Sequence, residues 1–268
     1  MSTRPAAWAG QFYPGNREEL LAEIKRYDAG QAEKEKCLGL VSPHAGYIYS
    51  GHVAGAAFSR IDIPDRVLIL APKHRLPGAD IALSPDDAWE TPLGDVETSP
   101  ELNSEIMRHC PMVELDALAH AREHSAEVQV PFIQYYNPDA RISAIVLHSQ
   151  DYEELRGLGE GIAEAIRALR GDVLIVASSD MSHFESQEFT EKQDKLAIDK
   201  VVALDGRGLL ETVQAHRISM CGYAPTTAML TACVELGAKE ARLVKYATSG
   251  DVTGDRSSVV GYASIIVK

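Results

Sequence analysis

The chain has few cysteines and no long hydrophobic run. Its four cysteines are widely spaced in 268 residues and form no CxxC pair, which excludes a disulfide-stapled scaffold and leads us to expect reduced thiols. No apolar segment approaches the roughly 20 residues that a membrane-spanning helix needs. The first five residues also lack the apolar core of a signal peptide. We therefore expect a soluble protein of the cytoplasm.

Basic residues are scarce as well. Lysine and arginine number 26 against 39 acidic residues, which gives a formal net charge of -13. Nucleic-acid binding depends on clustered cations that displace counterions, so this balance excludes a nucleic-acid partner and disfavours an anionic membrane surface. Hydrophobic residues nevertheless make up 45% of the chain and charged residues 24%, a balance typical of a globular protein with a substantial core.

The chain contains no linker, low-complexity tract or internal repeat, so we expect one domain over residues 1–268. Short runs rich in valine, isoleucine and leucine predict strands buried on both faces. These runs are residues 38–42, 66–71, 142–147 and 172–178. Helical patterns surround them at residues 17–28, 51–60, 99–109, 127–136, 152–169, 188–204, 206–215 and 225–236.

Alternation of strands and helices is typical of βαβ units. We therefore predict an α/β protein, a single three-layer αβα domain with a mostly parallel or mixed central sheet. The end of the chain differs, because the apolar runs 242–248 and 259–267 flank a polar loop. These two strands are expected to pair as a long-looped hairpin at or near a sheet edge.

Histidines follow three of the predicted strands. His44 comes after the first strand, His74 after the second and His183 after a later one. Ligands of open α/β sheets bind outside the carboxyl ends of the strands, so these side chains are expected to converge. Histidine is the commonest metal ligand, and two imidazoles with one anionic ligand suit a first-row ion such as iron. The alternative is that each histidine merely caps a turn or satisfies a buried backbone group.

The third ligand stays open at this point. Asp180, Glu127, Asp251 and Cys221 all have suitable chemistry, and their spacing does not choose among them. Cys221 comes just before a predicted helix, whose N-terminal field favours a thiolate.

His124 and Glu127 stand three residues apart at the start of a predicted helix. They share a helical face, as ligands or supporting pairs often do. An equally good interpretation is that Ser125 caps this helix and that the negative charge of Glu127 is favourable near the positive end of the helix dipole.

Five motifs in this order resemble the Memo family of Memo-like proteins, which includes protein B of the AmmeMemoRadiSam system. They are AGQFYP at 9–14, PHAGYIYSG at 43–51, EHSAE at 123–127, SSDMSH at 178–183 and MCG at 220–222. The resemblance implies a fold related to class III extradiol ring-cleavage dioxygenases, which use non-haem ferrous iron. It also implies association with a radical SAM protein and an AMMECR1-like protein.

Residue by residue, the resemblance matches His44 and His74 to the two histidine ligands and His183 to the acid–base histidine. Cys221 stands where the dioxygenases carry a glutamate ligand. A thiolate is a softer ligand than a carboxylate, so the site could bind copper as well as iron. The resemblance therefore does not imply that this protein cleaves catechol rings. Asp180 is expected to orient His183 or a ligand through a hydrogen bond.

Three functions follow from this pocket. The first is a metal-dependent redox enzyme that binds Fe(II), or copper, through His44, His74 and Cys221. The second is a peptide- or protein-binding module that uses the pocket without turnover, and the third is a zinc-dependent hydrolase. The side chains expected to contact a small-molecule or peptide substrate are Tyr47, Phe12, His124, Glu127 and Asp251.

Overall fold

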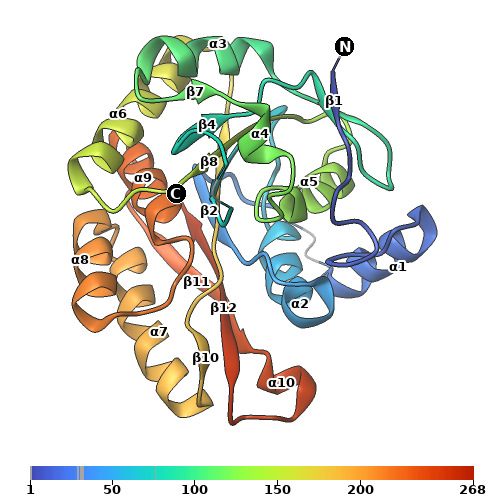
Figure 1. Cartoon of the computed structure of the whole chain (residues 1–268), viewed down its shortest axis with the longest axis vertical. Coiled ribbons are helices and arrows are strands. Elements are labelled where there is room, and N and C mark those ends of the chain that lie inside the picture. The colour runs from blue at the N-terminus through green and yellow to red at the C-terminus, as the bar shows by residue number, and fades with distance from the viewer. Residues whose placement is uncertain (1, 29, 31–32, 76) are drawn as a thin grey trace.

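The centre of the molecule is a mixed β-sheet covered by helices (Figure 1). The computed structural model describes residues 2–28, 30, 33–75 and 77–268. Within these residues the sheet has nine strands in the order β10-β12-β2-β9-β3-β8-β4-β7, and β11 pairs with β12. A small second sheet joins β1 (Thr3–Arg4), β5 (Ala88–Trp89) and β6 (Val96–Glu97). The predicted α/β class with a mixed sheet is confirmed.

Four parallel strands form the middle of the large sheet. They are β2 (Gly39–Ser42), β9 (Leu174–Ser178), β3 (Arg66–Pro72) and β8 (Arg141–Leu147). Antiparallel strands flank them, with β12 (Val259–Val267) beside β2 and β4 (Ile81–Leu83) beside β8. β7 (Glu114–Leu115) runs parallel to β4. The carboxyl ends of the middle strands therefore meet at one edge of the sheet.

The last two long strands form the predicted hairpin. β11 (Ala241–Thr248) pairs antiparallel with β12, and the short helix α10 (Gly250–Thr253) lies in the loop between them. The first part of β12 also pairs with β10 (His183–Glu185), and its last part pairs with β2. β12 thus links the segment that carries His183 to the middle of the sheet.

All eight predicted helical segments are helical in the structure, with boundaries shifted by up to four residues. The helices are α1 (Arg17–Tyr27), α2 (Tyr47–Phe58), α3 (Pro100–His109), α4 (Ala117–His120), α5 (Val130–Tyr136) after the 3-10 turn η1 (Glu127–Gln129), α6 (Tyr152–Ala168), α7 (Gln187–Val202), α8 (Gly206–His216) and α9 (Tyr223–Glu235). The sequence did not predict α4, α10 or the strands of two or three residues, because such short elements show no periodicity.

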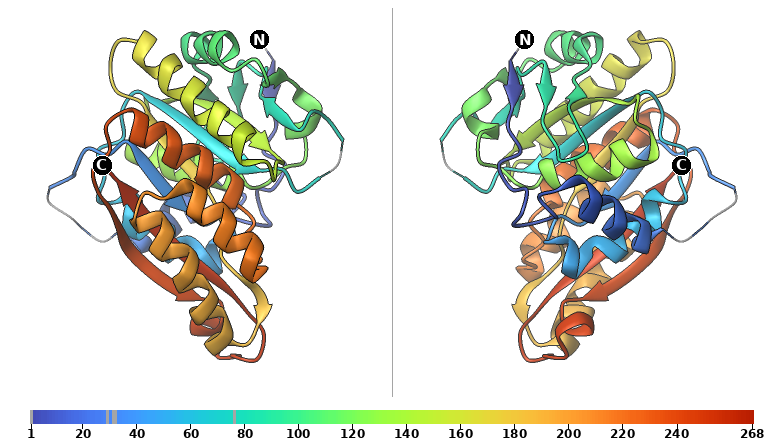
Figure 2. Two further views of the ribbon diagram at one scale, coloured as in Figure 1. Left: turned by 90° about the vertical axis from the view of Figure 1, so that its left-hand side faces the viewer. Right: turned by 90° about the vertical axis from the view of Figure 1, so that its right-hand side faces the viewer.

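Helices cover both faces of the sheet and make three layers (Figure 2). Leu68 and Leu70 of β3 point into a core shared with α3 and α6 to α9. Val67 and Ile69 of the same strand point into a second core shared with α1, α2 and α5. Both sets of side chains are fully buried, which explains why the strand lacks the alternating pattern of a half-exposed sheet.

Among the described residues, no helix is long and apolar enough to cross a lipid bilayer. All four cysteines are free thiols, with Cys110 and Cys233 buried and Cys37 and Cys221 partly buried.

A glycine where α6 packs on α9 gives a test of this arrangement. A Cβ added at Gly159 would lie 2.6 Å from the Ala228 carbonyl oxygen, whereas one at Gly157 would meet only the flexible end of Met112, at 3.4 Å. We expect Gly159→Ala to lower the free energy of unfolding by about 1–3 kcal/mol through overpacking. Gly157→Ala, the matched control, should raise it by up to about 1 kcal/mol through helix propensity. Denaturant unfolding of both variants measures this, and equal effects would contradict the described packing.

Candidate metal centre

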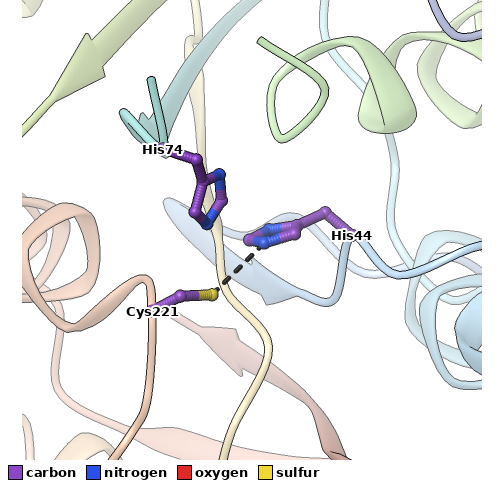
Figure 3. Close-up of side chains that lie close together, drawn as sticks. All are labelled: His44, His74 and Cys221. Carbon is purple, nitrogen blue, oxygen red and sulfur yellow. Dashed lines mark hydrogen bonds between the residues drawn. The ribbon is translucent and has the colours of Figure 1, made fainter. Parts of the chain in front are cut away.

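His44, His74 and Cys221 converge at the carboxyl edge of the sheet (Figure 3). His44 comes two residues after β2, His74 two residues after β3, and Cys221 two residues before α9. The three side chains point toward one another, and their ligand atoms all lie within 4.8 Å of one another. Cys221 Sγ lies 3.2 Å from His44 Nε2. The predicted meeting of these distant residues is confirmed.

The donor set fits a metal ion. Metal–nitrogen bonds of about 2.0–2.1 Å and a metal–sulfur bond of about 2.3 Å place sulfur and nitrogen roughly 3.6 Å apart around a tetrahedral ion. The separation of 3.2 Å between Cys221 Sγ and His44 Nε2 is close to this value. One sulfur and two imidazole nitrogens are ligands that iron, copper and zinc accept in proteins. These three residues are therefore a candidate metal centre.

His44 is buried, with 1% of its surface exposed. Burial lowers the pKa of His44 well below its ordinary value, and the charges of His124, His74 and His183 lower it further. The imidazole is therefore neutral at pH 7, which is the form that binds metals.

His74 is fixed by a carboxylate that the sequence analysis did not single out. Glu123 accepts hydrogen bonds from the His74 backbone N–H at 2.6 Å and from His74 Nδ1 at 2.9 Å. Burial by itself raises the pKa of Glu123, but the bonds and charges of His74 and His124 and the Ser125 N–H lower it to about 2. The anionic carboxylate keeps the proton on Nδ1, so Nε2 of His74 is free to bind a metal. No periodicity indicated Glu123, which adjoins the predicted His124.

Cys221 is a thiol in the metal-free protein. Burial, followed by the charge of Asp180, raises the pKa of Cys221 well above its ordinary value. Because His44 Nε2 lies within hydrogen-bonding distance, the thiol proton can be donated to that nitrogen. A metal ion would take the place of this proton.

Asp180 supports the loop that carries His44. Its Oδ1 accepts the backbone N–H groups of His44 at 2.8 Å and Ala45 at 3.2 Å. Its Oδ2 lies 3.9 Å from His44 Nε2, on the side of the metal centre. Burial raises the pKa of this carboxyl group, against the opposing charge of His183. Asp180 therefore orients a candidate ligand, and its hydrogen bonds go to the backbone around His44 instead of the His183 ring.

His183 lies beside the centre and is tied to the Cys221 segment. Its Nδ1 lies 2.9 Å from the Ser219 carbonyl, and its backbone N–H donates to Ser219 Oγ at 2.8 Å. A carbonyl only accepts, so the proton of a neutral His183 is on Nδ1 and the lone pair is on Nε2. Ser219 is two residues before Cys221, so these contacts hold His183 next to the segment that carries the candidate sulfur ligand. The sequence analysis did not predict a role for Ser219. The sequence feature that could have indicated it is its position two residues before Cys221.

Phe12 and His124 form an aromatic wall next to the ligands. The His124 ring stacks on His74 with centroids 4.8 Å apart and lies 5.4 Å from His44. Phe12 lies 4.5 Å from His124, and Trp8 lies 5.2 Å from Phe12. Burial lowers the pKa of His124 to about 4, despite the nearby charge of Glu123. Of the residues predicted to contact a substrate, His124 thus adjoins two candidate ligands, and Phe12 adjoins His124.

Glu127 contacts the N-terminal segment. Its carboxylate accepts from Arg4 Nη1 at 2.6 Å, from Tyr13 Oη at 2.6 Å and from the Trp8 backbone N–H at 2.8 Å. The side chains of Arg4 and Glu127 are 2% and 1% exposed. A buried ion pair of this kind is costly to break, so Glu127 holds the segment that supplies Trp8 and Phe12 to the aromatic wall.

Tyr47 and Asp251 use their polar atoms elsewhere. The Tyr47 hydroxyl donates to the Val128 carbonyl at 2.9 Å, and its ring packs in the core beside Phe132. Asp251 lies in α10, where its carboxylate accepts the Thr248 backbone N–H at 2.8 Å. The structure gives neither side chain a contact with His44, His74 or Cys221 among the residues it describes.

Comparison with known proteins shows which family the chain resembles. The sequence profile of the family described as Memo-like protein matches residues 4–266. A MEMO1 family protein of Methanopyrus kandleri is 40% identical over 279 residues, covering 99% of each chain. One of Pyrobaculum arsenaticum is 44% identical over 278 residues, again covering 99% of each. One of Methanococcoides burtonii is 44% identical over 262 residues, covering 97% of this chain and 98% of the relative.

The fold also has a solved counterpart. The crystal structure of the uncharacterized protein JW3007 from Escherichia coli K12 superposes with a TM-score of 0.56, covering 86% of this chain and 100% of that one. The two sequences are 13% identical, so the likeness concerns the fold alone. The match over residues 4–266 and the relatives at 40–44% identity show that this chain belongs to the Memo family.

Proposed function

We propose that this protein is a metal-dependent redox protein that binds one ferrous ion through His44, His74 and Cys221, with copper as the alternative ion. The observation that carries this proposal is the meeting of the three ligand atoms within 4.8 Å of one another. When bound, the ion would supply electron transfer and Lewis-acid activation of a substrate. The residues of the chain hold the ion, shape the pocket and move protons around it.

The charges around the centre favour a cation. Cys221 contributes a negative charge when its proton leaves, and Glu123, whose pKa is about 2, contributes a second. Asp180 adds another carboxylate 3.9 Å from His44 Nε2. Two or three buried negative charges around one point would balance a divalent ion and would repel a phosphate group. This arrangement supports metal binding over recognition of a phosphorylated peptide.

His183 is the residue proposed to hold or move a proton. Its Nδ1 is hydrogen-bonded to the Ser219 carbonyl, so Nε2 of the neutral ring can accept a proton from a substrate and return it. The ring is half-buried, and it does not belong to the group of ligand atoms formed by His44, His74 and Cys221. The aromatic wall of Phe12, Trp8 and His124 would enclose the substrate on one side.

Zinc-dependent hydrolysis is the second candidate, because two histidines and one cysteine with an open position also form a zinc site. Metal analysis of protein isolated without added metal separates the two functions. Iron or copper supports the redox proposal, whereas zinc alone, with a hydrolytic activity that chelators remove, would replace it.

Loss of a ligand is expected to abolish tight metal binding. In anaerobic competition titrations with Fe(II), His44→Ala, His74→Ala and Cys221→Ala should each weaken binding by more than about 100-fold, since loss of a supporting partner alone costs 10–100-fold. His216→Ala, on the exposed end of α8, is the matched control and should bind like the wild type. His183→Ala should also retain affinity. Wild-type affinity in the Cys221 variant would end the proposal.

Metal binding is expected to release a proton at neutral pH. The raised pKa of Cys221 keeps the thiol protonated, whereas the lowered pKa of His44 leaves that ring neutral. Below the pKa of Cys221, affinity should therefore rise with pH by about tenfold per unit, with about one proton released per ion. Calorimetry in buffers of different ionisation enthalpy measures this number. Cys221→Ala, titrated at high metal concentration, should lose that proton release, and an unchanged value would refute the assignment.

Neutralising Glu123 tests the support of His74. Glu123→Gln keeps the size of the side chain but removes the charge that fixes the Nδ1 proton, so Fe(II) affinity should fall about 10–100-fold. The ligands themselves remain, so binding should not disappear. Glu90→Gln, at an exposed glutamate, serves as the charge-matched control. Equal affinities of the two variants would show that Glu123 does not act on the centre.

A further inference from the structure

His44 is held from behind by Ser178, the last residue of β9. Its Nδ1 lies 2.9 Å from Ser178 Oγ. That hydroxyl donates its proton to the Ser125 carbonyl at 2.7 Å and accepts from Gln129 Nε2 at 2.8 Å. A hydroxyl has one proton to donate, so the hydrogen bond with His44 requires Ser178 to accept a proton from the ring.

This pattern decides the tautomer of His44. With the proton on Nδ1, the lone pair is on Nε2, the nitrogen that lies 3.2 Å from Cys221 Sγ. The other tautomer would place a proton on the nitrogen that must bind the metal. It would also bring the Nδ1 lone pair against the oxygen of Ser178, with no proton between them. Because an unsatisfied polar group in the interior is unfavourable, the Nδ1-protonated form is the more stable one.

Gln129 keeps Ser178 in this role. Its Nε2 also lies 2.9 Å from the Pro43 carbonyl and 3.4 Å from the Ser42 carbonyl. Carbonyl oxygens only accept, so the amide is oriented with its N–H groups toward both the loop and Ser178. Because Pro43 directly precedes His44, one side chain positions both the backbone and the hydroxyl behind the ligand.

Ser125 connects the same chain of hydrogen bonds to the second histidine. Its carbonyl accepts from Ser178, and its own hydroxyl donates to the Pro72 carbonyl at 2.8 Å. Pro72 lies two residues before His74. The three polar residues are fully buried, with 0% of their surface exposed, so water does not compete for these bonds.

We propose that Ser178, supported by Gln129 and Ser125, is a positioning residue that selects the Nδ1-protonated tautomer of His44 and thereby prepares Nε2 for metal binding. The effect on metal affinity rests on the proposed function. The tautomer is a property of the metal-free protein and does not depend on that function.

The first test uses the metal-free wild-type protein. Long-range proton–nitrogen NMR of protein with 15N-labelled histidine distinguishes protonated from unprotonated ring nitrogens, and His44→Gln identifies the His44 signals among the nine histidines. We expect His44 to be protonated at Nδ1 alone. Protonation at Nε2 in the wild type would overturn the proposal without any variant.

The second test removes the hydroxyl. In Ser178→Ala, we expect a mixture of His44 tautomers and a 10–100-fold loss of Fe(II) affinity, whereas Ser178→Thr should restore both. Ser143→Ala is the matched control, since Ser143 is a fully buried strand serine whose hydroxyl has no hydrogen-bond partner among the described residues. A pure wild-type tautomer in Ser178→Ala, or an affinity equal to that of Ser143→Ala, would overturn the proposal.

One outcome separates this inference from the proposed function. If the wild type binds no metal but the tautomer responds to Ser178→Ala, the proposed function fails and the positioning role stands.

If Ser178→Ala does not fold, as judged by circular dichroism, Gln129→Met replaces it. That variant should weaken Fe(II) binding about tenfold, and wild-type affinity there would count against the proposal.

Discussion

The candidate metal centre depends on one constraint, which is that each of its two imidazoles needs a hydrogen-bond acceptor behind it. Ser178 accepts from His44, and the carboxylate of Glu123 accepts from His74. An unfixed ring could turn or protonate the nitrogen that must bind the ion. Much of this support comes from residues 123–129, which reach back to the loops after β2 and β3.

The two histidines are supported by different chemistry. A charged carboxylate makes His74 a stronger electron donor, whereas a neutral hydroxyl leaves His44 the weaker one. The third candidate ligand, Cys221, offers a sulfur, which is a softer donor than a carboxylate oxygen. An ion held by these three residues would therefore have donors of unequal strength.

Much of this fold could be predicted from periodicity. The strands β2, β3, β8 and β9 are buried on both faces and so appear as continuous apolar runs, and their carboxyl ends mark where His44 and His74 lie. The short strands and α4 gave no such signal, since two to four residues are too few for a repeating pattern to be recognised. Glu127 was expected near a substrate, yet its carboxylate pairs with Arg4. His124 lies before the turn η1 that begins at Glu127, so the helical face that the two residues were predicted to share is absent from the structure. A spacing of three residues does not show where a helix begins.

The sequence by itself determined the α/β class, the family and the residues able to bind a metal, because these follow from local periodicity and from motifs that are contiguous in the chain. Only the tertiary structure showed that the ligand atoms of His44, His74 and Cys221 lie close together, and that Glu123 and Ser178 stand behind the rings. Those interactions join residues from 49 to 177 positions apart. No local pattern encodes them, because they arise only when strands from distant segments end at the same edge of one sheet.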